Sequence, residues 1–398
     1  MLSWDQMPTL AGMQRERAWV EIDLSALTHN VRQFRQITGQ QTQLMAVVKA
    51  DAYGHGAVTT AKTALQAGAT WLGVATVPEG IELREAGITA PILMLGATNT
   101  PEQVQAIAQW NLQPTLCTFK QAMVFAEAVS SYRAPLPVHL KFDTGMSRLG
   151  VPWQEAVDLA QFVVRSPQLR LASVYSHFAT ADDPDQTVMR LQESRFRHTI
   201  RQMMNAGITP PCLHVSNTAA TLTDANLHHD LVRVGLGLHG LYPAPHLRDR
   251  IHLKPVMQVK ARVTQVKPIA AGTGVSYGYR YIADRDIQMA VIGIGYADGV
   301  PRNLSNRMEV LIRGQRIPQI GSITMDQMML DVSTIPDLRE GEIVTLLGRD
   351  GQDEISADDW ADTLGTISWE ILCGFKHRLP RLAVNQPTEQ TETAHLPY

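Results

Sequence analysis

The chain has 398 residues, a length that favours two domains or one large barrel with an addition. Its hydrophobic fraction of 44% and charged fraction of 18% are ordinary for a soluble globular protein with a sizeable core. The net charge of −3 argues against nucleic-acid and membrane-surface partners.

The cysteines Cys117, Cys212 and Cys373 lie far apart and show neither metal-ligand spacing nor a disulfide framework. A reducing, cytoplasmic setting is therefore expected. Residues 1–17 lack the apolar core of a secretory signal, and no run is long enough to span a bilayer.

In chain order, an alternating strand is predicted first, at residues 19–24. Ser25 is predicted to cap the helix that follows. Further apolar strands are predicted at 44–48, 71–75, 91–95, 112–117, 137–142, 169–177, 211–216 and 231–236. Amphipathic helical patterns fill most of the gaps, for example 101–110, 121–129, 154–164 and 184–204.

These buried strands alternating with helices predict an α/β fold, a parallel (β/α)₈ TIM-type barrel. The alternative is an open doubly wound sheet, but no GxGxxG follows the first strand, which disfavours a dinucleotide-binding version. After about residue 253, short strand-like runs follow one another. We therefore expect a barrel domain over 1–253 and a mainly β C-terminal domain over 254–398, which the strand at 19–24 can join.

Residues 47–56, VVKADAYGHG, join the first barrel strand to the next helix. Lys49 lies at the strand tip, where poor solvation favours a neutral amine that can attack an aldehyde. Tyr53 adds a hydroxyl, and Gly54 and Gly56 let the backbone approach a ligand. One lysine at a strand end usually only closes the strand, but this combination is what a pyridoxal-phosphate site requires.

Sites in such barrels form at the C-terminal ends of the strands. The polar residues expected there, with one glycine, are Lys49, Tyr53, Lys141, Asp143, Arg148, His177, His214, Ser216, Asn217, Thr218, Arg233 and Gly235. Each alone could be a hydrogen-bonded filler or a salt-bridge residue, but together they predict one site. Asn217 and Thr218 precede a short helix, and with Gly235 they offer donors for a phosphate.

These motifs resemble those of the alanine racemase family, in the same order and from about residue 19 to residue 381. The resemblance implies a pyridoxal-phosphate-dependent isomerase that interconverts L- and D-alanine and supplies D-alanine for peptidoglycan. It implies that Lys49 holds the cofactor covalently and that His177 packs on its ring. The phosphate would be held by Tyr53, Thr218, Gly235 and Leu236.

The resemblance also gives Arg233 and His214 linked roles. Arg233 would contact the pyridine nitrogen and His214 would support it. A permanent positive charge there disfavours protonating the ring, which weakens the ring as an electron sink. A short-lived carbanion is then reprotonated at Cα, which favours racemisation over transamination.

The second domain carries the motifs GVSYGYRY, IGYADGVPR and GSITMDQMMLDV. Racemisation needs a base on each face of a planar carbanion. By resemblance, Lys49 serves the D-face and Tyr277 the L-face, with the tyrosine donated by the partner of a head-to-tail homodimer.

The remaining site residues also come from the resemblance. Tyr296 and Arg302 would line the entry, and Met325 and Asp326 would lie at the substrate carboxylate. Lys141 is at a position that is carbamylated in some members, where it orients the arginine corresponding to the substrate-binding Arg148.

Departures from the family leave alternatives open. His377 stands where well-known members have a phosphate-binding tyrosine, so a racemase that also accepts serine is one alternative. Ser322 replaces an arginine often found before the Met-Asp pair. A decarboxylase of the same architecture would need a carboxylate at the ring nitrogen in place of Arg233. A non-catalytic pyridoxal-phosphate carrier would resemble the barrel alone.

Overall fold

The computed structural model describes residue 15 and residues 17–386. Most of segment 1–17, which we expected to lack a secretory signal, lies outside the described residues. The chain forms two compact units, one spanning Leu27–Lys254 and one joining the chain up to Ala26 with the chain from Pro255 onward. Among the described residues, no helix combines the length and apolar character needed to cross a bilayer.

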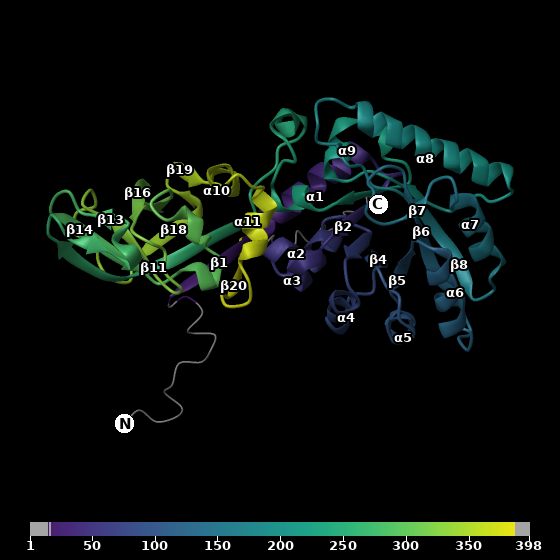
Figure 1. Ribbon diagram of the computed structural model, residues 1–398, viewed down its shortest axis with the longest axis horizontal. Helices are drawn as coiled ribbons and strands as arrows, with labels where there is room; N and C mark the ends of the chain where they lie inside the picture. Colours follow the sequence, from purple (N-terminus) through teal and green to yellow (C-terminus); the bar gives the residue numbers. More distant parts are fainter. Residues whose placement is uncertain (1–14, 16, 387–398) are drawn as a thin grey trace, which may run out of the picture. The chain divides into compact units, whose positions relative to one another are not determined.

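The unit Leu27–Lys254 is built on parallel strands with helices outside them (Figure 1). Its strands are β2 (Gln43–Val47), β3 (Trp71–Val74), β4 (Ile92–Ala97), β5 (Gln113–Leu116), β6 (Leu136–Asp143), β7 (Val151–Pro152), β8 (Leu169–Tyr175), β9 (Leu213–His214) and β10 (Leu231–Val234). The main path runs β10-β2-β3-β4-β5-β6-β8-β9 with every neighbouring pair parallel. The predicted TIM-type barrel is confirmed.

The barrel closes between β9 and β10 through isolated hydrogen bonds and not through a regular ladder. The Asp230 N–H donates to the Leu213 carbonyl at 3.1 Å, and the Arg233 N–H donates to the Ser216 carbonyl at 2.9 Å. Because β9 has only two residues, the wall is least regular between the strands that carry His214 and Arg233.

The helices α1 (Leu24–Thr38), α2 (Lys49–Gly54), α3 (Ala57–Gln66), α4 (Val77–Glu85), α5 (Pro101–Gln109), α6 (Phe119–Ala128), α7 (Ala156–Arg165), α8 (Thr187–Asn205) and α9 (Thr218–Thr223) follow the strands. Thr100 and Thr118 accept backbone N–H groups at the starts of α5 and α6, which satisfies donors that have no partner within the helix.

The prediction that Ser25 caps the first helix is wrong. Helix α1 begins at Leu24, and the acceptor for the Ala26 N–H is the Asp23 carboxylate at 2.8 Å. Ser25 lies within the first turn and donates its own hydroxyl to Asp23 at 2.7 Å. A carboxylate one residue before the helix accepts both groups at once, and its charge suits the positive end of the helix dipole.

The second unit contains a mostly antiparallel sheet. The strands of this unit are β1 (Ala18–Asp23), β11 (Met257–Ile269), β12 (Gly274–Val275), β13 (Tyr281–Ile282), β14 (Ile287–Ile292), β15 (Glu309–Ile312), β16 (Gln315–Ile320), β17 (Met328–Asp331), β18 (Ile343–Asp350), β19 (Asp353–Ile355) and β20 (Arg381–Val384). β12 and β13 pair only with each other, and the other strands form the sheet. The order is β19-β18-β15-β16-β17-β14-β11-β1-β20, and β18 also pairs with β11, which curls the sheet on itself.

The N-terminal strand β1 lies between β11 and β20 and so belongs to this second sheet. Two short helices, α10 (Ala357–Leu364) and α11 (Ser368–Gly374), precede β20. The mainly β C-terminal domain predicted from the sequence is confirmed.

Candidate active site

Lys49 opens a turn with an unusual backbone. Residues 50–53 all have φ between 51° and 56°, the left-handed helical region, although none of them is glycine. This conformation costs about 1–2 kcal/mol per L-residue. Strain of this kind persists only where the surrounding structure fixes it, and it is typical of functional sites.

Two carboxylates fix the turn. Glu79, at the start of α4, accepts the Ala50 N–H at 2.8 Å. Asp51 accepts the Ala57 N–H at 2.7 Å, which ties the turn to the first residue of α3. The half-buried Lys49 is therefore held at the end of β2 by contacts on both sides.

Tyr53, Thr218 and Gly235 form a small polar cradle. The N–H groups of Gly235 and Gly237 donate to the Thr218 Oγ1 at 3.2 and 3.5 Å. Because that oxygen already accepts two N–H groups, its own hydrogen can be donated to a ligand. A Cβ on Gly235 would lie 2.5 Å from the Tyr53 Oη, so only glycine fits beside the tyrosine hydroxyl.

Asn217 and Leu236 flank this cradle. The Asn217 Oδ1 accepts the Ala220 N–H at 2.9 Å and caps α9, the short helix that the sequence predicted here. Leu236 begins a 3₁₀ turn, η3 (Leu236–His239), directly after Gly235. The cradle thus lies where two helical turns begin.

Arg233 is 4% exposed on β10. Four hydrogen bonds hold its guanidinium, to His214 Nδ1 at 3.0 Å, His177 Nδ1 at 3.1 Å, the Ser176 carbonyl at 2.9 Å and the Val215 carbonyl at 3.0 Å. Burial lowers the pKa of Arg233 to about 10, so the guanidinium stays charged at neutral pH. Burial, followed by the charge of Arg233, holds the pKa values of both histidines well below the usual range.

Lys141, on β6, adds a second buried cation. Its pKa is lowered to about 8 by burial first and then by the positive charges of Arg233, Arg148 and Lys49. Asp143 accepts the Gly145 and Ser147 N–H groups at 2.9 and 3.0 Å and so shapes the loop before Arg148. The strand ends bring together positive charges that suit an anionic ligand.

Tyr175 is a site residue that we did not predict. Its ring stacks on His214 with centroids 4.6 Å apart and planes 6° apart. Lys141 Nζ and Arg233 Cζ lie 5.5 and 5.3 Å from its centroid, positions that favour cation–π attraction. Its hydroxyl meets Thr115 Oγ1 at 2.7 Å. A buried aromatic in a strand resembles ordinary core, so its proximity to His177 in the motif YSHFAT is the only signal.

In the second unit, Tyr277 begins the 3₁₀ turn η5 (Tyr277–Tyr279) and is 71% exposed. Serine hydroxyls hold its loop. Ser322 Oγ donates to the Tyr277 carbonyl at 2.8 Å, and Ser276 Oγ donates to the Ser322 carbonyl at 2.7 Å. The Tyr277 backbone is therefore fixed while its side chain faces outward.

Tyr296 and Met325 lie on two loops that are joined by backbone hydrogen bonds. The Tyr296 N–H donates to the Thr324 carbonyl and the Ala297 N–H to the Met325 carbonyl, both at 3.0 Å. A Cβ on Gly295 would lie 2.2 Å from the Thr324 carbonyl oxygen, so the close approach requires glycine.

Ion pairs secure the same loops. Asp326 pairs with Arg378 at 2.6 Å, and the buried Asp298 pairs with Arg17 at 2.6 Å. His377, next to Arg378, is exposed in the segment between α11 and β20. The exposed Arg302 begins the 3₁₀ turn η7 (Arg302–Leu304).

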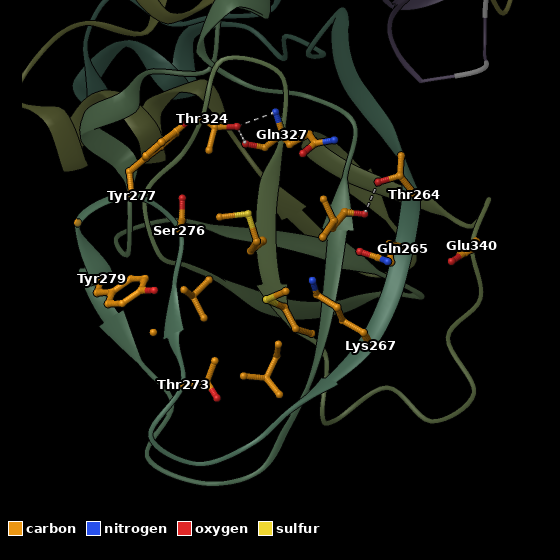
Figure 2. Close-up of a pocket in the computed structure, with 17 residues that line it drawn as sticks. Thr264, Gln265, Lys267, Thr273, Ser276, Tyr277, Tyr279, Thr324, Gln327 and Glu340 are labelled. Carbon is orange, nitrogen blue, oxygen red and sulfur yellow. Dashed lines mark hydrogen bonds between the residues drawn. The ribbon is translucent and has the colours of Figure 1, made fainter.

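A hollow of about 950 Å³ adjoins Tyr277 in this unit. Figure 2 shows Ser276, Tyr277 and Tyr279 on one side of it and Gln265, Lys267 and Glu340 on the other. Its floor includes the side chains of Val275, Met289, Val291 and Met329. Polar and apolar side chains line the hollow together, and exposed aromatic side chains such as Tyr277 and Tyr279 beside it are typical of a protein contact surface.

Comparison with known proteins identifies the family. Residues 22–243 match alanine racemase N-terminal domains, and residues 256–383 match alanine racemase C-terminal domains. This chain belongs to the alanine racemase family. It is therefore an isomerase.

Individual alanine racemases resemble the chain along nearly its whole length. The alanine racemase of Nostoc sp. is 64% identical over 96% of this chain and 100% of its own, and that of Synechocystis sp. is 62% identical over 94% and 100%. The solved structure from Streptomyces lavendulae is 36% identical, with a TM-score of 0.87 over 95% of this chain and 98% of its own. The Clostridium difficile structure is 33% identical, with a TM-score of 0.89 over 93% and 96%.

The residues that the alanine racemase resemblance assigns fall into two groups. Lys49, Lys141, Arg148, His177, His214 and Arg233 are brought together electrostatically or by hydrogen bonds in the barrel unit. Tyr53, Thr218 and Gly235 share the cradle of that unit. Tyr277, Tyr296, Met325, Asp326 and His377 belong to the other unit.

Proposed function

We propose that the chain is a pyridoxal-phosphate-dependent alanine racemase that interconverts L- and D-alanine as a head-to-tail homodimer. Lys49 serves the D-face and Tyr277 the L-face. The buried Arg233, charged and bonded to two neutral histidines, carries the proposal because this arrangement suits racemisation.

The donors of the barrel unit fit the cofactor. Tyr53 and Thr218 offer hydroxyl groups for its phosphate. Gly235 would keep the cradle open for it, since a Cβ there would leave no room beside Tyr53 and its own N–H is donated to Thr218 Oγ1. Asn217 and Leu236 flank the same place. The positive charges of Lys141, Arg148 and Arg233 would offset the negative charges of the cofactor phosphate and the substrate carboxylate.

When bound, the cofactor would supply an electron-withdrawing group on the substrate nitrogen, which would make the hydrogen on Cα acidic. The Lys49 amine removes or returns that proton on the D-face, and the Tyr277 Oη does so on the L-face. His177 packs against the ring, and His214 supports Arg233.

Arg233 distinguishes this proposal from a decarboxylase. Its partners are two histidines and two carbonyl groups, and a carboxylate is not among its hydrogen-bond partners in the described part of the chain. A guanidinium has no proton acceptor and keeps its charge, so it disfavours protonation of the ring nitrogen. The matched C-terminal domain argues against a carrier that consists of the barrel alone.

The exposed residues of the second unit support the dimer. Tyr277 and Met325 are 71% and 53% exposed, which is unusual for side chains that must meet a substrate in a dry site. Docking onto the barrel of a second copy would bury them. Arg148 and the Met325 N–H would bind the substrate carboxylate, with Asp326 holding the loop and Tyr296 at the entry.

The test is to incubate the purified, cofactor-loaded protein with L-alanine and, separately, with L-serine, and to measure both enantiomers by chiral chromatography. Equal amounts of L- and D-alanine with little D-serine are expected. Comparable D-serine would broaden the substrate and make His377 the first position to change. Visible cofactor binding without any D-enantiomer would overturn the proposal. A cytoplasmic supply of D-alanine for peptidoglycan is the role we propose in the cell.

A further inference from the structure

A line of hydrogen bonds leads from Arg233 away from the cofactor cradle. His214 Nδ1 lies 3.0 Å from the guanidinium, and His214 Nε2 lies 2.8 Å from Ser173 Oγ. Ser173 Oγ meets His139 Nδ1 at 2.6 Å, and His139 Nε2 meets Gln113 Oε1 at 2.8 Å. The line takes one residue from each of the successive barrel strands β10, β9, β8, β6 and β5.

Arg233 fixes the direction of every proton in this line. A guanidinium only donates, so His214 Nδ1 accepts. A neutral imidazole has one N–H, which for His214 is then on Nε2 and is donated to Ser173. The Ser173 hydroxyl in turn donates to His139 Nδ1, and the proton on His139 Nε2 is donated to the Gln113 carbonyl oxygen.

Burial keeps the His139 and His214 side chains neutral, and packing restricts the motion of the His214 ring. Each is 1% exposed. Burial lowers the pKa of His139 to about 3, and burial with the charge of Arg233 holds the pKa of His214 well below its usual range. The parallel stack with Tyr175 fixes the plane of the His214 ring. A second proton on His214 would point an N–H at the Arg233 guanidinium.

We propose that Ser173 and His139 are positioning residues that hold His214 as the Nε2–H tautomer and thereby keep Arg233 aimed and charged. This inference rests on the proposed function, in which Arg233 meets the cofactor ring. Without the Ser173 hydroxyl, His214 is free to take the Nδ1–H form, which cannot accept a hydrogen bond from Arg233.

The chemical consequence is a side reaction. A loosened Arg233 permits protonation of the ring and reprotonation on the cofactor. The alanine amino group then passes to the cofactor, whose aldehyde carbon is reduced to an aminomethyl group, while alanine is oxidised to pyruvate. The amino group of alanine and the aldehyde oxygen of the cofactor change places, and the two electrons lost by alanine are gained by the cofactor. No further reactant is needed.

The test compares Ser173→Ala with the matched control Thr199→Val. Both remove a buried hydroxyl, but Thr199 Oγ1 donates to the Trp153 and Arg195 carbonyl groups and lies outside the line. Gln113→Leu breaks the half-exposed far end of the line and serves if Ser173→Ala does not fold.

The first measurement is nitrogen-15 NMR of histidine side chains in the full-length, cofactor-loaded protein, with His139→Gln and His214→Gln to assign the signals. Both rings should be neutral with the proton on Nε2 in wild type and in Thr199→Val. His214 should become a mixture of tautomers in Ser173→Ala. A charged or Nδ1–H His214 in wild type would overturn the proton order.

The second measurement is pyruvate formed per racemisation event. Ser173→Ala should raise this ratio about tenfold, the effect of losing one buried hydrogen bond, and Gln113→Leu should raise it in the same direction. Equal ratios in Ser173→Ala and Thr199→Val would overturn the positioning role. A wild type that racemises nothing would overturn the proposed function, whereas the NMR pattern tests the proton order independently.

Discussion

The barrel mouth and the Tyr277 loop are built in opposite ways. Arg233 is buried and held by four hydrogen bonds, whereas the Tyr277 side chain is 71% exposed and only its backbone is fixed. The barrel unit therefore carries a prebuilt charged site within one chain. The loop carries the proposed second base as an exposed side chain, whose surroundings would come from a second copy in the shared site that we propose.

Removing Lys49 should give the largest effect on the barrel side. Lys49→Ala is expected to lower racemisation more than about 10⁴-fold, because in the proposed mechanism one side chain both holds the cofactor and moves a proton. The visible absorbance of the bound cofactor should disappear. Lys62→Ala, an exposed lysine on α3, is the control and should behave like wild type. Retained absorbance and turnover in Lys49→Ala would remove Lys49 from the mechanism.

On the loop side, Tyr277→Phe should lower racemisation about 10²- to 10⁴-fold, the usual contribution of one acid–base group. L- and D-alanine have equal free energies, so kcat/KM must stay equal in both directions. The face is instead read from hydrogen exchange in D₂O by proton NMR.

In Tyr277→Phe, Lys49 should still exchange the Cα hydrogen of D-alanine while exchange from L-alanine is lost. Tyr279→Phe is the matched control, since Tyr279 belongs to the same turn and is 69% exposed. Equal loss of exchange from both enantiomers would argue against a separate base for the L-face.

The third prediction concerns the buried positive charge of Lys141 and its effect on the stability of the barrel unit. Its pKa in the folded protein, about 8, lies below the ordinary 10.5, so the folded state binds fewer protons than the unfolded state between these values. Stability therefore rises with pH across this window, and the buried charge costs about 3 kcal/mol below it. Lys141→Met should remove that dependence.

The measurement is the free energy of unfolding of wild type and Lys141→Met in CO₂-depleted buffer. The wild type should gain about 3 kcal/mol relative to the variant as pH rises from about 8 to about 10.5. A difference that stays constant with pH would mean that Lys141 does not titrate as a free buried amine.

Ser322 tests the fixed backbone of the loop and should give the smallest effect. Ser322→Ala removes the hydrogen bond to the Tyr277 carbonyl, worth about 0.5–1.5 kcal/mol. We expect kcat/KM for alanine to fall about threefold to tenfold. Thr363→Ala, which removes a hydroxyl bond on α10, controls for stability. Equal kcat/KM in the two variants would show that the loop holds Tyr277 without Ser322.

The sequence predicted the barrel because strand and helix periodicities are local signals. It also predicted the polar strand ends, since parallel strands bring those ends together. The left-handed turn at 50–53 could not be predicted, because alanine and aspartate oppose that conformation locally and distant contacts such as that of Glu79 impose it.

Other features were missed for the same reason. In the sequence, Tyr175 cannot be told from a core residue, and its stacking on His214 is seen only in the structure. Ser322 could be noticed only because the family often has an arginine there, and its hydrogen bond to the Tyr277 carbonyl is likewise seen only in the structure. Ser25 was expected to cap α1, but Asp23 competes for the same N–H group and accepts it. Each case depends on a contact that periodicity does not describe.

The place of β1 affects how the chain is made. Ala18 pairs with Ala261 and Val20 with Arg381, so β1 pairs with strands that are synthesised much later. The whole unit Leu27–Lys254 emerges in between and can fold as it appears. Throughout that time β1 has unpaired backbone groups on both edges, and a nascent chain stalled there would expose a strand ready to pair with a neighbour. Slowing synthesis before residue 257 should therefore raise aggregation more than slowing it after residue 384.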